Sequence, residues 1–96
     1  FVEPTGPAVQ KLAITASSFK FDQTQYNLGK AGITEVDYLD GGGSHTLAVA
    51  GIDGFELAVP GGPTKGKIDL KAGTYTIYCT VPGHRAQGME AKVVVK

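Results

Sequence analysis

The residues able to bind a soft metal are few, and most of them are clustered. The chain has one Cys, one Met and two His. Cys79, His84 and Met89 follow one another as Cys-x4-His-x4-Met, whereas His45 lies well upstream after a run of glycines. One thiolate, two imidazoles and one weak thioether form a ligand set that suits copper in both oxidation states. The sequence therefore predicts a single Cu(I)/Cu(II) ion bound by His45, Cys79, His84 and Met89.

Other interpretations of the lone cysteine are weaker. A single Cys can be a small buried hydrophobe, a nucleophile or one ligand of a mixed site, but it excludes a Cys₂ or Cys₄ metal site within one chain. A thiol hydrolase needs a base and an orienting group beside the thiol. Cys79 instead alternates with Tyr75 and Ile77 on an apolar face, and no helix N-terminus is predicted to activate it. Because three of the four rare residues lie between Cys79 and Met89, the copper interpretation is favoured.

Short alternating runs predict the scaffold that positions these residues. Residues 74–79 alternate strictly, and Met89, Ala91, Val93 and Val95 share one face of the last run. Fourteen glycines, roughly twice the average share, break the chain at short intervals. No helical period is present. We therefore predict an all-β protein with seven or eight strands in two packed sheets.

Two segments are predicted to lie outside the strands. Residues 1–8 contain two prolines and a glycine and are expected to form an N-terminal tail or linker, which leaves one domain at residues 9–96. Gly51–Pro63 contains four glycines and two prolines and is expected to be an irregular loop. Its apolar residues Phe55 and Leu57 are expected to fold back onto the core.

Composition excludes several classes of partner. Nine basic and nine acidic residues give a net charge of zero, which argues against binding to nucleic acid or to an anionic membrane surface. No apolar run reaches the ~18 residues of a membrane span. Because the sequence starts at Phe1, we expect a processed protein or an excised domain.

The ligand motif resembles that of a known family. Residues 72–79, Ala-Gly-Thr-Tyr-Thr-Ile-Tyr-Cys, followed by His84 and Met89, look like the C-terminal signature of the cupredoxins, the small blue copper proteins. Ser44-His45-Thr46 is similar to the family's isolated first histidine. The resemblance implies a Greek-key β-sandwich, a type 1 copper site and one-electron transfer, not enzymatic catalysis. The four residues between Cys79 and His84 make the loop similar to that of auracyanins and sulfocyanins.

The same resemblance implies three residues that support the ligands. Many cupredoxins have Asn after the first His ligand, where this chain has Thr46. That position ties the histidine strand to the residue after the Cys, here Thr80, so we expect the two hydroxyls to form a hydrogen bond. Ser44 occupies the position whose carbonyl approaches copper in azurin-like proteins.

Partners, location and context are also expectations from the resemblance. We expect a redox protein as donor and another as acceptor, no small-molecule substrate, and docking at an apolar surface around His84 formed by Val81, Pro82, Gly83 and Ala86. We expect a monomer in the periplasm or another extracytoplasmic compartment. A membrane tether that was lost before Phe1 is a further possibility of this interpretation. Two alternatives remain. The chain is a cupredoxin domain cut from a larger oxidase or reductase, or it is a metal-free β-sandwich binding module.

Overall fold

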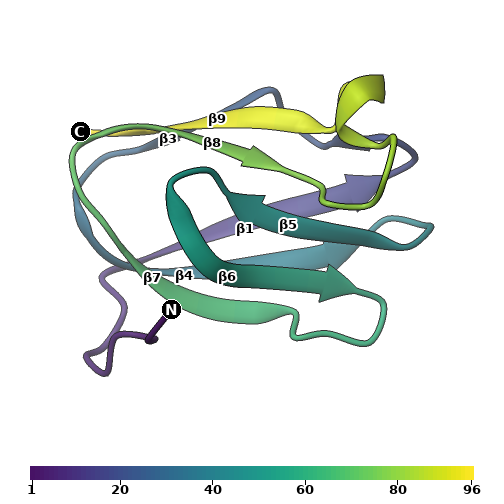
Figure 1. Ribbon diagram of the computed structural model, residues 1–96. Coiled ribbons are helices and arrows are strands. Elements are labelled where there is room, and N and C mark those ends of the chain that lie inside the picture. Colours follow the sequence, from purple (N-terminus) through teal and green to yellow (C-terminus); the bar gives the residue numbers. More distant parts are fainter.

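Nine strands form two packed sheets in the computed structural model, which describes all 96 residues (Figure 1). One sheet has the order β2-β1-β4-β7, made of Lys20–Phe21, Gln10–Ser17, Gly32–Asp40 and Lys65–Leu70. The other has the order β3-β9-β8-β5-β6, made of Gln25–Leu28, Glu90–Val95, Gly73–Tyr78, His45–Val49 and Ile52–Val59. The prediction of an all-β sandwich is confirmed.

Alternation of apolar and polar residues explains why these segments are strands. Along β1, Leu12, Ile14 and Ala16 are buried, while the residues between them face outward. Strand β9 shows the same alternation, with buried Ala91, Val93 and Val95. Together the inward faces of both sheets form one core cluster of 21 buried residues, the arrangement expected when each sheet buries one face against the other.

The prediction of an irregular loop at Gly51–Pro63 is wrong, because most of it is strand β6. Its residues Phe55, Leu57 and Val59 are buried with a period of two, and β6 pairs antiparallel with β5. A register shift between Ala48 and Val49 accommodates the tight connection between the two strands. With β6 and the two-residue β2, the strand count is nine, so the predicted count of seven or eight is too low.

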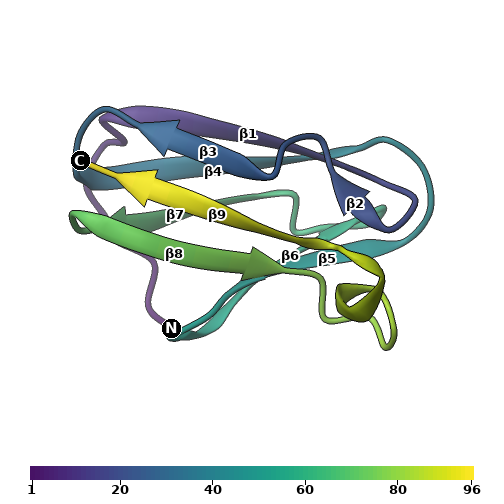
Figure 2. The ribbon, with the colours of Figure 1, turned by 90° about the horizontal axis from the view of Figure 1, so that it is seen from above.

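The chain passes repeatedly between the sheets, and these connections gather four loops at one end. From β4 it crosses to β5 and β6, returns to β7, and crosses again to β8 and β9. The β1–β2, β4–β5, β6–β7 and β8–β9 connections lie at the end away from the C-terminus (Figures 1 and 2). The β8–β9 connection contains the 3₁₀ turn η1, Arg85–Gln87. Loop residues from distant parts of the sequence therefore meet there.

Residues 1–9 contain no helix or strand but contact the sheets. The Glu3 carboxylate accepts the Lys67 backbone N–H at 2.8 Å, and the Phe1 ring packs edge-on against Phe55. The domain boundary between residues 8 and 9 stays a prediction. Because the one helical element is the three-residue η1, no helix of this structure could cross a membrane.

Candidate metal centre

The four predicted ligands lie at the loop end of the sandwich, three of them beside the end of a strand and the fourth within a loop. His45 is the first residue of β5, Cys79 directly follows β8, and Met89 directly precedes β9. His84 lies in the β8–β9 connection, just before η1. Cys79 and Met89 are 1% and 0% exposed and His45 is 4% exposed, whereas His84 is only partly buried. The scaffold thus places three of these side chains in the protein interior and one at the surface.

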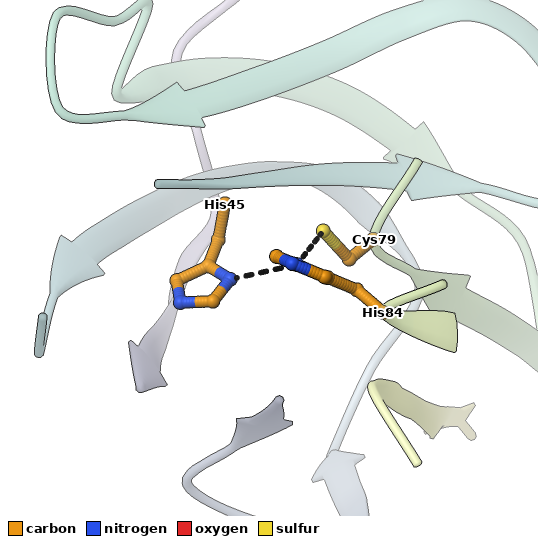
Figure 3. Close-up of side chains that lie close together, drawn as sticks. All are labelled: His45, Cys79 and His84. Atoms are coloured by element: carbon orange, nitrogen blue, oxygen red, sulfur yellow. Dashed lines mark hydrogen bonds between the residues drawn. The ribbon is translucent and has the colours of Figure 1, made fainter. Parts of the chain in front are cut away.

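Three of the side chains converge on one point, as Figure 3 shows. The ligand atoms of His45, Cys79 and His84 all lie within 4.8 Å of one another. His84 Nδ1 is 3.2 Å from His45 Nδ1 and 3.5 Å from Cys79 Sγ. Two imidazole nitrogens and one sulfur therefore surround a shared space.

The glycine run before β5 sets the orientation of His45. The outer ring nitrogen, Nε2, lies 3.0 Å from the Gly42 carbonyl oxygen, which can only accept a hydrogen bond, so Nε2 carries the proton. In the neutral ring this leaves the lone pair of Nδ1 pointing at the shared space. A Cβ on Gly43, whose φ is +83°, would lie 2.8 Å from Nε2. The sequence signalled these glycines only as a strand break, but they position a predicted ligand.

The donor set of the converging atoms fits copper. His45 Nδ1 offers a lone pair, and His84 Nδ1 and Cys79 Sγ face it from the other sides. A soft thiolate with two imidazoles selects copper or zinc over hard cations such as Mg²⁺. The residues present therefore match the predicted ion, and copper is the redox-active choice.

Met89 is joined to the other loop ligands through the main chain. Its backbone N–H donates to the His84 carbonyl at 3.1 Å, and its carbonyl accepts the Cys79 N–H at 3.2 Å. These bonds close the loop upon itself and bring the fully buried Met89 beside the other two residues. Its place as a ligand stays a prediction.

A hydrogen-bond network holds the strand ends around Cys79. The Thr46 N–H donates to Cys79 Sγ at 3.4 Å. The Thr46 and Thr80 hydroxyls lie 2.6 Å apart, and the Thr80 N–H donates to Thr46 Oγ1 at 2.7 Å. On the core side, the Tyr38 hydroxyl donates to the Thr46 carbonyl at 2.9 Å, and burial, with a smaller effect of Cys79, raises the pKa of this hydroxyl above its usual value. Ser44 is exposed, and the role of its carbonyl stays a prediction.

The residues predicted to dock partners flank His84 in the β8–β9 connection, and their docking role stays a prediction. Pro82, Gly83 and Ala86 are exposed and Val81 is partly buried. The one charge inserted among them is neutralised, because Arg85 Nε donates to the Glu90 carboxylate at 2.6 Å and its guanidinium lies over the Tyr78 ring. The surface beside His84 is therefore mostly apolar.

Phe19 is a neighbour of the site that the sequence did not indicate. It lies in the turn between β1 and β2, is 41% exposed, and meets the His84 ring edge-on at a centroid distance of 5.0 Å. Its φ of +61° is in the left-handed region, which bulky residues avoid. An apolar sequence pattern alone could not reveal this contact, because it depends on two loops meeting in three dimensions.

Comparisons with known proteins agree with this geometry. Residues 20–96 match the family described as copper binding proteins, plastocyanin/azurin family. Among curated protein sequences no match reaches significance. Auracyanin B has a similar solved structure, with a TM-score of 0.69, 19% identity, and coverage of 98% of this chain and 94% of that one.

Two further structures are similar in fold. A dithionite-reduced auracyanin from the photosynthetic bacterium Roseiflexus castenholzii gives a TM-score of 0.68 at 15% identity, covering 94% of this chain and 99% of that one. A chain of a heme-copper terminal oxidase dimer gives 0.65 at 19% identity, covering 98% of this chain and 72% of that one. At these identities the similarity shows a shared fold.

Proposed function

Because the chain belongs to the plastocyanin/azurin family of copper-binding proteins, we propose that it carries single electrons between two redox proteins. The proposed ligands of its one type 1 copper ion are His45, Cys79, His84 and Met89. A bound copper ion supplies a Cu(II)/Cu(I) couple that accepts and releases one electron. The observation that carries the proposal is the convergence of the His45, Cys79 and His84 ligand atoms within 4.8 Å.

The chain's own contribution is to hold these ligands in place. The Gly42 carbonyl fixes the ring of His45 from outside. The backbone bonds among Cys79, His84 and Met89 fix the loop. Ligands that are already arranged by the fold move little when the charge of the site changes, so the energetic cost of reorganisation stays small.

Met89 is proposed as a weak fourth ligand. It is the one thioether in the chain, and its side chain is fully buried at the inner end of the loop. A thioether is a soft, weak donor whose added electron density stabilises Cu(II), so it lowers the potential more than it retains the ion.

Electrons are proposed to enter and leave through the exposed edge of His84. The surrounding surface of Val81, Pro82, Gly83 and Ala86 is mostly apolar, and the chain as a whole has no net charge. Electrostatic steering should then be weak, and complexes with the donor and the acceptor should be short-lived and apolar. This use of the site as an electron relay is the basis for proposing that the protein is not an enzyme.

Family membership also supports proposals about its setting. We propose a monomer that works in the periplasm or another extracytoplasmic compartment, and a tether before Phe1 in a longer precursor is compatible with this. Sedimentation of the purified protein tests the monomer, and fractionation of the source cells with a specific antibody tests the compartment. Dimerisation or a cytoplasmic pool would contradict these proposals.

A second context is favoured by one comparison. The fold is shared with a chain of a heme-copper terminal oxidase dimer, of which this chain covers 72%. The protein could therefore serve as the copper domain of a larger oxidase or reductase, handing electrons to another domain of the same assembly. The mass of the native protein in source cells separates the two contexts. A mass too small to include a further folded domain beside these 10.0 kDa supports the separate carrier, and a mass larger by one or more domains supports the second context.

The function is tested by a spectroelectrochemical titration of the copper-loaded protein. We expect a reversible change that corresponds to one electron per chain, with no loss of metal over repeated cycles. The zinc-loaded protein is the matched control, because zinc accepts the same ligands but has no redox chemistry. A copper-loaded protein that releases the ion on reduction, or that takes up no electron, would contradict the proposal.

A further inference from the structure

A short chain of hydroxyl groups connects Cys79 to a carboxylate at the surface. Thr46 Oγ1 lies 3.6 Å from Cys79 Sγ and 2.6 Å from Thr80 Oγ1. Thr80 Oγ1 in turn donates to Glu56 Oε1 at 3.3 Å. Thr46 is at the start of β5, Thr80 follows β8, and Glu56 is on β6, so three separate segments contribute to the chain.

Counting protons shows that Glu56 decides the direction of this chain. Each hydroxyl has one hydrogen to donate, and an ionised carboxylate can only accept. When Thr80 donates to Glu56, it has no hydrogen left for Thr46, so Thr46 must donate to Thr80 across the 2.6 Å contact. The Thr46 hydroxyl is then unable to donate to Cys79 Sγ, and of the two Thr46 donors only the backbone N–H, at 3.4 Å, bonds the sulfur.

The same heavy atoms support the opposite arrangement. Without an acceptor beyond it, the Thr80 hydroxyl can donate to Thr46 Oγ1, which has two lone pairs and already accepts the Thr80 N–H. The Thr46 hydroxyl is then free to donate to Cys79 Sγ. The sulfur would then accept two hydrogen bonds from Thr46 in place of one.

We propose that Glu56 is a positioning residue that lowers the reduction potential by turning the Thr46 hydroxyl away from the Cys79 sulfur. The inference rests on the proposed copper site. A hydrogen bond to the thiolate draws electron density from the sulfur and weakens its donation to Cu(II), which favours Cu(I) and raises the potential. Glu56 acts through Thr80 and Thr46 and does not contact a proposed ligand.

The decisive variant is Thr80→Val, because it cuts the link to Glu56 without changing any charge. Thr80 is exposed, so a valine fits, and its backbone N–H remains available to Thr46. The Thr46 hydroxyl can then donate a hydrogen bond to Cys79 Sγ, so the reduction potential measured by voltammetry should rise. In the Thr46→Val background, where no hydroxyl is available to bond the sulfur, Thr80→Val should leave the potential unchanged.

Glu56→Ala and Thr80→Val together form a double-mutant cycle. Glu56→Ala should raise the potential, but part of the rise comes from losing a negative charge. Combined with Thr80→Val, Glu56→Ala should add only that charge effect, so the two changes should be less than additive. Purely additive shifts would overturn the proposal.

A spectroscopic readout separates this role from a structural one. Exchange into D₂O shifts the copper–sulfur stretch in the resonance Raman spectrum when an exchangeable proton bonds the sulfur, and the shift should be larger in Thr80→Val than in the wild type. An unchanged potential and an unchanged isotope shift in Thr80→Val would overturn the proposal while leaving the copper site intact. Failure of the copper function itself would be recognised separately, by a wild-type protein that shows no copper–thiolate band.

Discussion

The strained backbone of Phe19 gives the sharpest prediction about stability. An L-residue with a Cβ in the left-handed region costs about 1–2 kcal/mol compared with its usual conformation. Phe19 has a φ of +61°, so it adopts this unfavourable conformation, although 41% of its surface is exposed and gains no burial in return. The contact of its ring with His84 is the feature that a glycine in this turn would not supply. Strain of this kind is concentrated at functional sites.

Two substitutions isolate the strain. Phe19→Ala and Phe19→Gly both remove the ring, so the lost packing cancels between them. Alanine retains the strain of about 1–2 kcal/mol, whereas glycine relieves it but gives up about 0.5–1 kcal/mol through the greater freedom of the unfolded chain. The difference between these two effects is about 0–1.5 kcal/mol. The free energy of unfolding should therefore be about 0.75 kcal/mol higher for the glycine variant than for the alanine variant, the reverse of the usual order.

Urea unfolding of the metal-free variants measures this difference. An alanine variant that equals or exceeds the glycine variant in stability would refute the left-handed conformation at Phe19 and the reasoning built on it. In the Cu(I) form, both variants should also show faster motion of the His84 ring in NMR relaxation, because its edge-on neighbour is gone. An unchanged ring would show that Phe19 does not restrain His84.

Three further predictions concern the site and its surroundings. Met89→Leu should keep copper and change the unfolding free energy of the metal-free protein by less than about 1.5 kcal/mol. It should raise the potential measured by voltammetry, because a donor to Cu(II) is lost. Val81→Asp should slow electron self-exchange between oxidised and reduced copies, measured by NMR line broadening, with an unchanged copper spectrum. Tyr38→Phe should cost about 1 kcal/mol of stability in urea, because the Thr46 carbonyl loses its partner.

Each of these has its own control or contrary outcome. Loss of copper from a folded Met89→Leu would show that Met89 retains the ion and does not merely tune it. Thr74→Asp places the same charge at the start of β8, away from the loop end, and an equal slowing there would exclude the apolar surface as the route. As pH rises above about 10, the free energy of unfolding should fall less steeply for Tyr38→Phe than for the wild type. The native Tyr38 hydroxyl has a raised pKa and keeps its proton while the unfolded one ionises, so the unfolded state gains relative stability with rising pH.

Much of the site could be predicted from the sequence because its ligands are chemically rare. One Cys, one Met and two His leave few ways to build a metal site, and three of these residues are fixed near one another by chain length alone. The convergence of His45 could not be obtained by spacing, because the sandwich brings β5 beside the β8–β9 loop. His45 is predicted as a ligand because it is the one other histidine of the chain and completes the copper donor set, and the resemblance agrees with this.

The remaining features depend on backbone conformation and on contacts between distant segments. Strand β6 was missed because the glycines and prolines at residues 51–63 outweighed the alternation of Phe55, Leu57 and Val59. The carbonyl of Gly42 beside His45 and the carboxylate of Glu56 beside Thr80 are set by how loops and strands meet. No local pattern in the sequence encodes such contacts.

The visible absorption spectrum of the oxidised, copper-loaded protein tests the central claim most directly. A buried thiolate bound to Cu(II) should give an intense charge-transfer band, blue or green in colour, that bleaches on reduction and returns on oxidation. The same band should be absent from Cys79→Ser, which keeps the shape of the side chain but replaces the sulfur. A colourless wild-type protein with a full equivalent of Cu(II), or a Cys79→Ser variant that keeps the colour, would contradict the account.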